Sequence, residues 1–443
     1  MAKGVELMAE EVMVIGGGLA GCEAAYHLAE QGIRVRLAEM RPVKMTPVHQ
    51  TGCLAELVCS NSLKSQDLGT AQGLLKAEMR ELGSLLLQCA ETARVPAGSA
   101  LAVDRELFST RVTDVIRSHP LIKVVNQEVK ALPVSDIAVV ATGPLTSESL
   151  ALAISDVTGE EHLFFYDAVA PIVTAESLNM DKVFRASRYG KGGDDYLNCP
   201  FTRDEYERFY AALVEADIHE GHPVDRNLFF ESCMPIEVMA RRGIESLRFG
   251  PMRPVGLASP TGDKSYAVLQ LRQEDQNGTL YSLVGFQTRL RWREQERVFR
   301  LIPGLENADF VRYGVMHRNT YINSPRLLEA TLQFKVSPNL FFGGQITGCE
   351  GYMESAATGI LAGINAARMV RGEPLLALPD TTLLGALTLH ISSAPGGNFQ
   401  PMNANFGLLP PLEKKIKIKK ARYQAYSQRS LTELKGFLEQ WGL

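Results

Sequence analysis

Several features are missing from this sequence, and each absence excludes a class of protein. No run of residues approaches the roughly 18 apolar positions that a membrane-spanning helix needs. The seven cysteines are odd in number, contain no C-x-x-C pair, and form no cluster with the eight histidines at metal-ligand spacing. The chain also lacks a secretory start. We therefore expect a cytoplasmic protein with reduced thiols, no metal site, no redox disulfide and no membrane span.

Positive charge is scarce overall but gathers at one end of the chain. The net charge of −4 argues against a protein that binds nucleic acid without selectivity. Residues 413–443, however, hold eight Lys or Arg and three Glu, a net of +5 that leaves −9 on residues 1–412. A basic segment on an acidic body favours a large anionic partner.

A glycine-rich turn follows the first apolar run. Residues 12–15 are short, apolar and partly β-branched, as expected for a buried parallel strand, and a helix over 19–31 and a strand over 35–39 should follow. Such glycines let the backbone approach a pyrophosphate closely, and Glu39 can accept hydrogen bonds from ribose hydroxyls. The pattern predicts FAD or NAD rather than NADP, and the three-glycine spacing disfavours S-adenosylmethionine. The turn matches G-x-G-x-x-G with Gly16, Gly17, Gly18, Leu19, Ala20 and Gly21.

Two later segments favour FAD over NAD. An apolar strand at 137–140 runs into Gly143, and another at 340–342 runs into Gly344, as in elements that close an FAD site. A helix that starts near Tyr352 would direct its positive end at the flavin pyrimidine, and Tyr352 is a candidate for stacking on the ring. A buried tyrosine at a helix start is the alternative interpretation.

The order of these segments predicts an α/β fold with a discontinuous Rossmann-type FAD-binding domain. A chain of 443 residues exceeds what one core usually holds. Residues 166–325 change character, with aromatic and Arg-rich segments and weaker parallel-strand signals. We assign them to an inserted α+β domain for the substrate, between a first FAD-binding part at 8–165 and a second part at 326–443 that carries a basic C-terminal tail. Residues 359–371 should pack as the last helix of the FAD-binding domain.

The longer motifs resemble one family, the folate- and FAD-dependent tRNA (uracil-5-)-methyltransferases, which are small GidA-like flavoproteins. The resemblance covers nearly the whole chain. It implies 5,10-methylenetetrahydrofolate as carbon donor, reduced FAD as electron source, NADH or NADPH as reductant, and the T-loop uridine at tRNA position 54 as target. It is carried by the strings VIGGGLAG (14–21), EMRP (39–42), ELVCSNSL (56–63), FESCMPIE (230–237) and GGQITG (343–348).

Two cysteines in these motifs suit the chemistry that the resemblance implies. Uracil C5 is a poor nucleophile until a thiolate adds to C6. We assign that addition to Cys233, which lies in the inserted region with several arginines, and a role as base or transient partner at the flavin side to Cys59; the exchanged assignment stays open. We interpret Cys22, Cys89 and Cys349 as small buried hydrophobic residues. The roles of Cys53 and Cys199 stay undecided.

A tRNA partner requires positive charge and stacking. Three groups offer it: an arginine-rich segment at 289–300 that contains Trp292, a second group at 241–253, and the basic run at 414–422. A solvated charged face is the alternative for each group. Two other functions also remain: a flavoenzyme acting on the wobble uridine, whose relatives are longer, and a non-catalytic FAD-containing RNA-binding protein. The predicted RNA contacts are Arg241, Arg242, Arg289, Arg291, Lys414 and Lys415.

Overall fold

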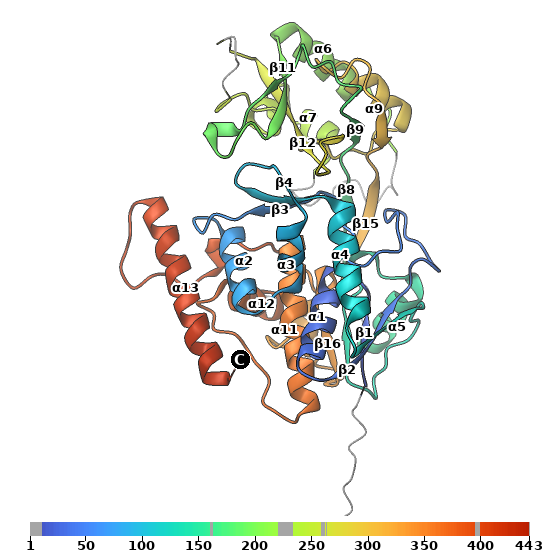
Figure 1. The fold of residues 1–443 in the computed structure, drawn as a ribbon, viewed down its shortest axis with the longest axis vertical. Coiled ribbons are helices and arrows are strands. Elements are labelled where there is room, and N and C mark those ends of the chain that lie inside the picture. Colours follow the sequence, from blue (N-terminus) through green and yellow to red (C-terminus); the bar gives the residue numbers. More distant parts are fainter. Residues whose placement is uncertain are drawn as a thin grey trace, which may run out of the picture.

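A five-stranded parallel sheet lies in the lower half of the molecule in Figure 1, which shows a computed structural model. The structure describes residues 11–159, 163–219, 234–257, 262, 264–394 and 399–442. The strand order is β16-β7-β1-β2-β6. Val14 of β1 lies opposite both Leu37 of β2 and Val139 of β7. The strands span Glu11–Ile15 (β1), Arg34–Glu39 (β2), Ile122–Asn126 (β6), Ala138–Val140 (β7) and Leu340–Phe342 (β16).

This sheet joins distant parts of the chain, because β16 pairs with β7 in parallel although 199 residues separate Val140 from Leu340. The helix pair α1 (Leu19–Glu30) and α11 (Tyr352–Val370) covers one face. The two helices approach closely through small residues: a Cβ on Gly359 would lie 2.2 Å from the Ala20 carbonyl oxygen. The expected α/β architecture with a Rossmann-like parallel sheet is confirmed. Helix α11 begins at Tyr352, where a helix start was expected, and it contains most of the 359–371 segment that was expected to pack as the last helix; α12 and α13 follow it.

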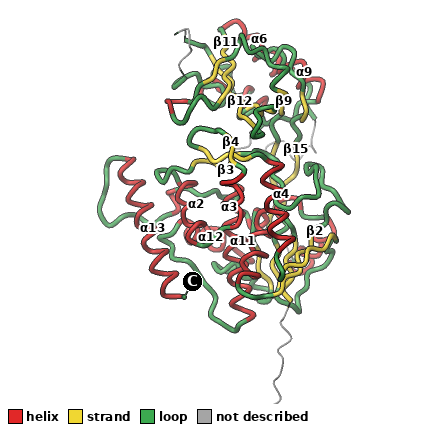
Figure 2. The backbone as a smooth tube through the Cα atoms, viewed as in Figure 1, coloured by secondary structure: helices red, strands yellow, loops and turns green. Residues whose placement is uncertain are grey.

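Further helices and a small antiparallel sheet complete this half of the molecule (Figure 2). Buried leucines of α2 and α3 pack into the same core as α1 and α11. The elements are β3 (Ser62–Ser65), α2 (Ala71–Glu81), α3 (Leu85–Thr92), β4 (Arg94–Val95), β5 (Ala100–Val103), α4 (Arg105–Ser118), α5 (Glu148–Thr158), α10 (Ser324–Leu327), α12 (Leu383–Ser393) and α13 (Lys419–Trp441).

A second sheet of six strands, with neighbouring strands antiparallel, forms the upper half in Figure 1. It has its own core, in which Phe209, Phe286 and Phe299 are fully buried. The antiparallel pair β8 (Leu163–Ala168) and β15 (Met316–Tyr321) connects the halves. The boundaries at 165/166 and 325/326 remain a prediction. The elements are β9 (Ile172–Thr174), β10 (Phe184–Arg185), β11 (Tyr196–Phe201), α6 (Arg203–Glu215), α7 (Ile236–Ala240), α8 (Ser246–Phe249), β12 (Ala267–Gln273), β13 (Leu280–Leu283), α9 (Trp292–Phe299) and β14 (Phe310–Arg312).

The C-terminal helix α13 is docked on the body of the protein rather than free. Leu434 and Leu438 are buried in the main core. The carboxylate of Glu78 on α2 accepts hydrogen bonds from the Leu383 N–H at 2.7 Å, at the start of α12, and from the Ser430 hydroxyl on α13. Burial raises the pKa of Glu78 to about 7. The basic segment that the sequence marks as a tail therefore contains residues of the core.

No helix in the described ranges is long and apolar enough to span a bilayer. The same residues contain no group of His, Cys, Asp and Glu that could hold a metal ion.

Candidate functional site

A cavity of about 970 Å³, part of it open to solvent, lies at the carboxyl ends of β1, β2 and β7. Ligands of open α/β sheets bind at this edge. Eight of the ten predicted cofactor residues line the cavity, and Gly17 and Gly21 lie behind the lining. The eight are Gly16, Gly18, Leu19, Ala20, Glu39, Gly143, Gly344 and Tyr352.

Glycine is needed for different reasons at the three motif positions Gly16, Gly18 and Gly21. A Cβ on Gly16, where φ is 103°, would lie 2.5 Å from the Ala141 carbonyl oxygen, and one on Gly21 would lie 1.8 Å from the Gly16 carbonyl oxygen. These two glycines are required by the packing of the protein itself. A Cβ on Gly18 would meet no protein atom within 4 Å, and its φ of −79° is ordinary for any residue. The open space beside Gly18 is the cavity, which fits a group that approaches the backbone closely.

Glu39 is a buried carboxylate held by Arg41. Its oxygens accept hydrogen bonds from the Gly17 N–H at 2.7 Å and from the Arg41 Nε at 2.9 Å. Burial favours the neutral form of Glu39, but the charge and hydrogen bonds of Arg41 outweigh burial and lower the pKa. An ionised carboxylate has about four acceptor positions, so Glu39 can hold the turn and still accept from a ligand hydroxyl. Sequence reasoning noted Arg41 in a motif without giving it this role.

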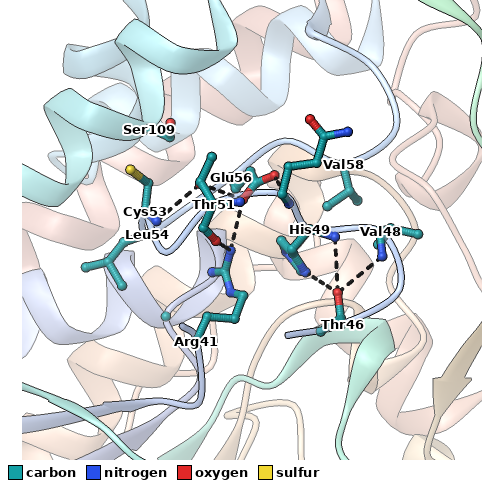
Figure 3. A network of polar contacts seen from close by, with 12 residues as sticks. Arg41, Thr46, Val48, His49, Thr51, Cys53, Leu54, Glu56, Val58 and Ser109 are labelled. Atoms are coloured by element: carbon teal, nitrogen blue, oxygen red, sulfur yellow. Dashed lines mark hydrogen bonds and ion pairs between the residues drawn. The ribbon is translucent and has the colours of Figure 1, made fainter. Parts of the chain in front are cut away.

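Arg41 also orders the loop that closes one side of the cavity (Figure 3). Its Nη1 donates to Glu56 at 3.2 Å and to the Thr51 carbonyl oxygen at 3.3 Å. Further along the loop, the Thr46 hydroxyl lies 2.6 Å from Nδ1 of His49. Burial, followed by the charge of Arg41, lowers the pKa of His49 to about 4, so this cavity-lining ring is neutral at pH 7. No spacing in the sequence marks His49.

The loop that carries Cys59 is fixed beside the cavity. The backbone N–H groups of Cys59 and Ser60 both donate to the hydroxyl of Tyr352, at 2.7 and 3.0 Å. Arg105 donates to the carbonyl oxygens of Leu57 at 2.8 Å and of Cys59 at 3.3 Å. Burial raises the pKa of Tyr352, so its hydroxyl is neutral. Tyr352 thus lines the cavity and binds the thiol loop, while its stacking on a flavin remains a prediction.

The second sheet also holds this loop. Arg272 on β12 donates to the side chains of Ser60 at 2.9 Å and Asn61 at 2.6 Å. Glu274, which follows β12, pairs with Arg105 at 2.5 Å. The position of the Cys59 loop therefore depends on both halves of the molecule.

The predicted catalytic Cys233 lies outside the described residues. Of the other cysteines, Cys22, Cys89, Cys199 and Cys349 are buried, as small hydrophobes would be. Burial raises the pKa of Cys89 and of Cys349 to about 11, which disfavours reactivity.

The predicted RNA contacts are not equivalent. Arg289 is half-buried and pairs with the buried Glu237 at 3.3 Å. That ion pair gives Arg289 a structural partner, although its RNA contact is still untested. The other five are exposed: Arg241, Arg242, Arg291, Lys414 and Lys415.

The sequence resembles that of known proteins over nearly its whole length. The family model "Glucose inhibited division protein A" (GIDA) matches residues 11–374. A protein of Syntrophomonas wolfei named methylenetetrahydrofolate–tRNA-(uracil-5-)-methyltransferase TrmFO is 65% identical over 431 residues, covering 97% of this chain and 99% of the relative. The Moorella thermoacetica protein of the same name is 58% identical and covers 96% of this chain and 97% of the relative.

Among solved structures, Aquifex aeolicus GidA superposes with a TM-score of 0.71 over 97% of this chain and 74% of that chain. At 18% sequence identity this likeness concerns the fold alone. The family resemblance read from the motifs is confirmed by the sequence comparisons. The chain belongs to the GidA family and, within it, to the methylenetetrahydrofolate–tRNA-(uracil-5-)-methyltransferases TrmFO.

Proposed function

We propose that this protein methylates C5 of the T-loop uridine at tRNA position 54. The carbon comes from 5,10-methylenetetrahydrofolate, and the electrons come from FAD reduced by NADH or NADPH. The observation that carries the proposal is the junction between the glycine-lined cavity and the Cys59 loop, which share Tyr352. The name shared by relatives that are 65% and 58% identical supports the same activity.

The residues around the cavity fit FAD by their chemistry. The turn at Gly18 leaves room for a pyrophosphate against the backbone, and the ionised Glu39 accepts ribose hydroxyls. FAD, when bound, supplies the two electrons that turn a transferred methylene into a methyl group.

The thiols supply the remaining chemistry. Addition of the Cys233 thiolate to uracil C6 makes C5 nucleophilic enough to attack the methylene carbon. As C5 attacks, the bond between the methylene carbon and one folate nitrogen breaks. We assign to Cys59 the role of the base that removes the C5 proton, after which the bond to the remaining folate nitrogen breaks and tetrahydrofolate leaves. The carbon that stays on C5 would be reduced to a methyl group by the two electrons that bound FAD supplies, and release of the Cys233 thiolate restores the ring. Arg105 and Arg312 lie within electrostatic range of the Cys59 thiol and stabilise negative charge on its sulfur.

A turnover assay tests the proposal directly. Purified protein with NADH or NADPH, methylenetetrahydrofolate and an unmodified tRNA transcript should yield 5-methyluridine without S-adenosylmethionine, as measured by nucleoside analysis. A transcript with cytidine at position 54 is the control and should yield none. Product that requires S-adenosylmethionine, or a modified nucleoside at the wobble position, would contradict the proposal.

Binding of tRNA should depend on the exposed basic run before α13. Deleting residues 413–443 would also remove Leu434 and Leu438 from the core, so substitution is the cleaner change. The double variant Lys414→Gln, Lys415→Gln should bind tRNA more weakly, with the slope of log Kd against log salt reduced by about two, because each phosphate contact contributes about one. Lys123→Gln, an exposed charge on β6, is the control. An unchanged slope would assign the run to a solvated surface.

A further inference from the structure

Three aromatic rings stack from the core of the second sheet to its surface. Phe310 packs on the buried cluster and lies 5.7 Å from Tyr313, with 16° between the ring planes. Tyr313 in turn lies 5.5 Å from Trp292, again at 16°. Trp292 ends the stack and is 59% exposed. One face of the indole is covered by Tyr313, and the exposed remainder of the ring can stack on another planar group.

The rings are held in place before any ligand arrives. The hydroxyl of Tyr313 donates to Glu296, which lies one turn after Trp292 on α9. The backbone of Trp292 is therefore fixed as the first residue of α9, and Tyr313 packs on one face of its ring. Fixed aromatic surfaces bind with little loss of conformational entropy.

Arginines without a carboxylate partner among the described residues lie beside Trp292 in the sequence. Arg297 pairs with Glu294 at 2.6 Å and Arg300 with Glu296 at 3.9 Å. Arg291 and Arg293, on either side of Trp292 in sequence, are exposed, and neither forms an ion pair with any residue that the structure describes. Of this arginine-rich segment, the two cations next to Trp292 are thus the ones open to phosphate groups.

The stack lies next to the segment that reaches the thiol loop. Arg312, between Phe310 and Tyr313 in the chain, donates to the carbonyl oxygens of Val58 at 2.9 Å and Val48 at 3.3 Å. Val58 immediately precedes Cys59. In Figure 1, α9 lies on the outer side of the upper half, above β15. The segment that carries Phe310 and Tyr313 therefore also contacts, through Arg312, the loop that leads to Cys59.

We propose that Trp292 is a stacking platform for an unpaired nucleobase of RNA, with Arg291 and Arg293 binding the flanking phosphates. Base stacking on an exposed aromatic ring with cations beside it is the usual mode of single-strand recognition. The identity of the RNA as tRNA rests on the proposed function, whereas the stacking surface does not. A looped RNA supplies such a base, and a duplex does not.

The test measures binding without folate or reductant, so that it does not depend on turnover. The FAD-loaded Trp292→Ala variant should bind a tRNA transcript and a hairpin with an unpaired loop roughly 5- to 150-fold more weakly than wild type. Trp292→Phe should retain most of the affinity, and a fully paired duplex should bind both variants as it binds wild type. Because the chain has two tryptophans, a Trp441→Phe protein reports on Trp292 alone, and its fluorescence should be quenched by the hairpin and not by the duplex.

The outcomes separate this inference from the proposed function. If Trp292→Ala binds the hairpin as wild type does, the platform is overturned even when wild type methylates tRNA. Equal losses for hairpin and duplex would likewise overturn base stacking, because they indicate a general loss of charge or shape. If wild type binds the hairpin through Trp292 but forms no 5-methyluridine in the turnover assay, the proposed function fails and the platform stands.

Discussion

A Gly18→Val protein should fold normally and purify without FAD. Gly18 has an ordinary φ of −79°, and an added Cβ would meet no protein atom within 4 Å, so we expect the substitution to leave the packing of the chain intact. The side chain would instead occupy the space where the backbone approaches the pyrophosphate. Overpacking a rigid site by a few methyl groups weakens binding by on the order of 100-fold. The flavin absorbance of the purified protein, before and after incubation with FAD, measures the effect.

Gly21→Ala is the matched control because it changes the same motif but is expected to lower the stability of the protein itself. Its Cβ would lie 1.8 Å from the Gly16 carbonyl oxygen, so the turn and α1 must shift. This variant should lower the melting temperature of the apoprotein, whereas Gly18→Val should leave it near the wild-type value. A yellow Gly18→Val protein with wild-type FAD affinity would contradict the placement of the pyrophosphate.

The parts of the fold that the sequence predicts are those whose cause is local. The buried strand β1, the glycine turn and α1 follow one another within 20 residues, and a backbone that must turn tightly between a strand and a helix leaves glycine at fixed positions. Apolar strands at 137–140 and 340–342 were also predicted, because both are short apolar runs that lead into glycines, whereas their pairing as β7 and β16 was not. The start of α11 at Tyr352 was also predicted, whereas the close contact of its small residues with α1 was not.

The parts that escaped prediction depend on contacts between distant residues. The Tyr352 hydroxyl accepts from the N–H of Cys59, 293 positions away, and no local pattern indicates that pairing. The docking of α13 depends on Leu434 and Leu438, two apolar positions within a strongly charged segment, together with the polar contact between Ser430 and Glu78. Charge composition alone suggested a tail, because composition does not show which face of a helix is buried.

The arginine-rich segment shows the same limit for the candidate RNA contacts. Its arginines look alike in sequence, yet Arg289 and Arg297 form ion pairs with carboxylates. Arg291 is exposed and forms no ion pair with a described residue. Only the fold brings Glu237 to Arg289, across 52 residues. A count of charges therefore overestimates how many arginines are open to a partner.

The largest loss of activity is expected from replacing either motif cysteine with alanine. Removing a covalent nucleophile typically costs about 10⁴-fold or more in turnover, and removing a positioned general base costs about 10²- to 10⁴-fold. Cys59→Ala and Cys233→Ala should both therefore produce almost no 5-methyluridine. Cys53→Ala is the control: Cys53 is half-buried, lies six residues from Cys59, and should leave turnover near the wild-type rate.

Trapping with 5-fluorouridine at tRNA position 54 separates the roles of the two thiols. The N–H of Cys59 donates to Tyr352 and its carbonyl oxygen accepts from Arg105, which fixes the backbone of Cys59 beside the cavity. Cys233 precedes Met234 and Ile236, and the Ile236 N–H donates to the Gln287 carbonyl oxygen at 2.7 Å within the second half of the molecule. A tRNA loop that approaches along the exposed arginines meets this half first.

Wild type and Cys59→Ala should therefore form a denaturant-stable adduct with the fluorinated tRNA, visible as a shifted band on a denaturing gel, and Cys233→Ala should form none. The reverse pattern would exchange the two assignments, and trapping by both variants would exclude either cysteine as the sole nucleophile. The nucleophile must approach C6 to roughly 3–3.5 Å, so only a thiol that reaches this distance can be trapped. An adduct that survives in Cys59→Ala and is lost in Cys233→Ala would assign the addition to C6 to the Cys233 thiol.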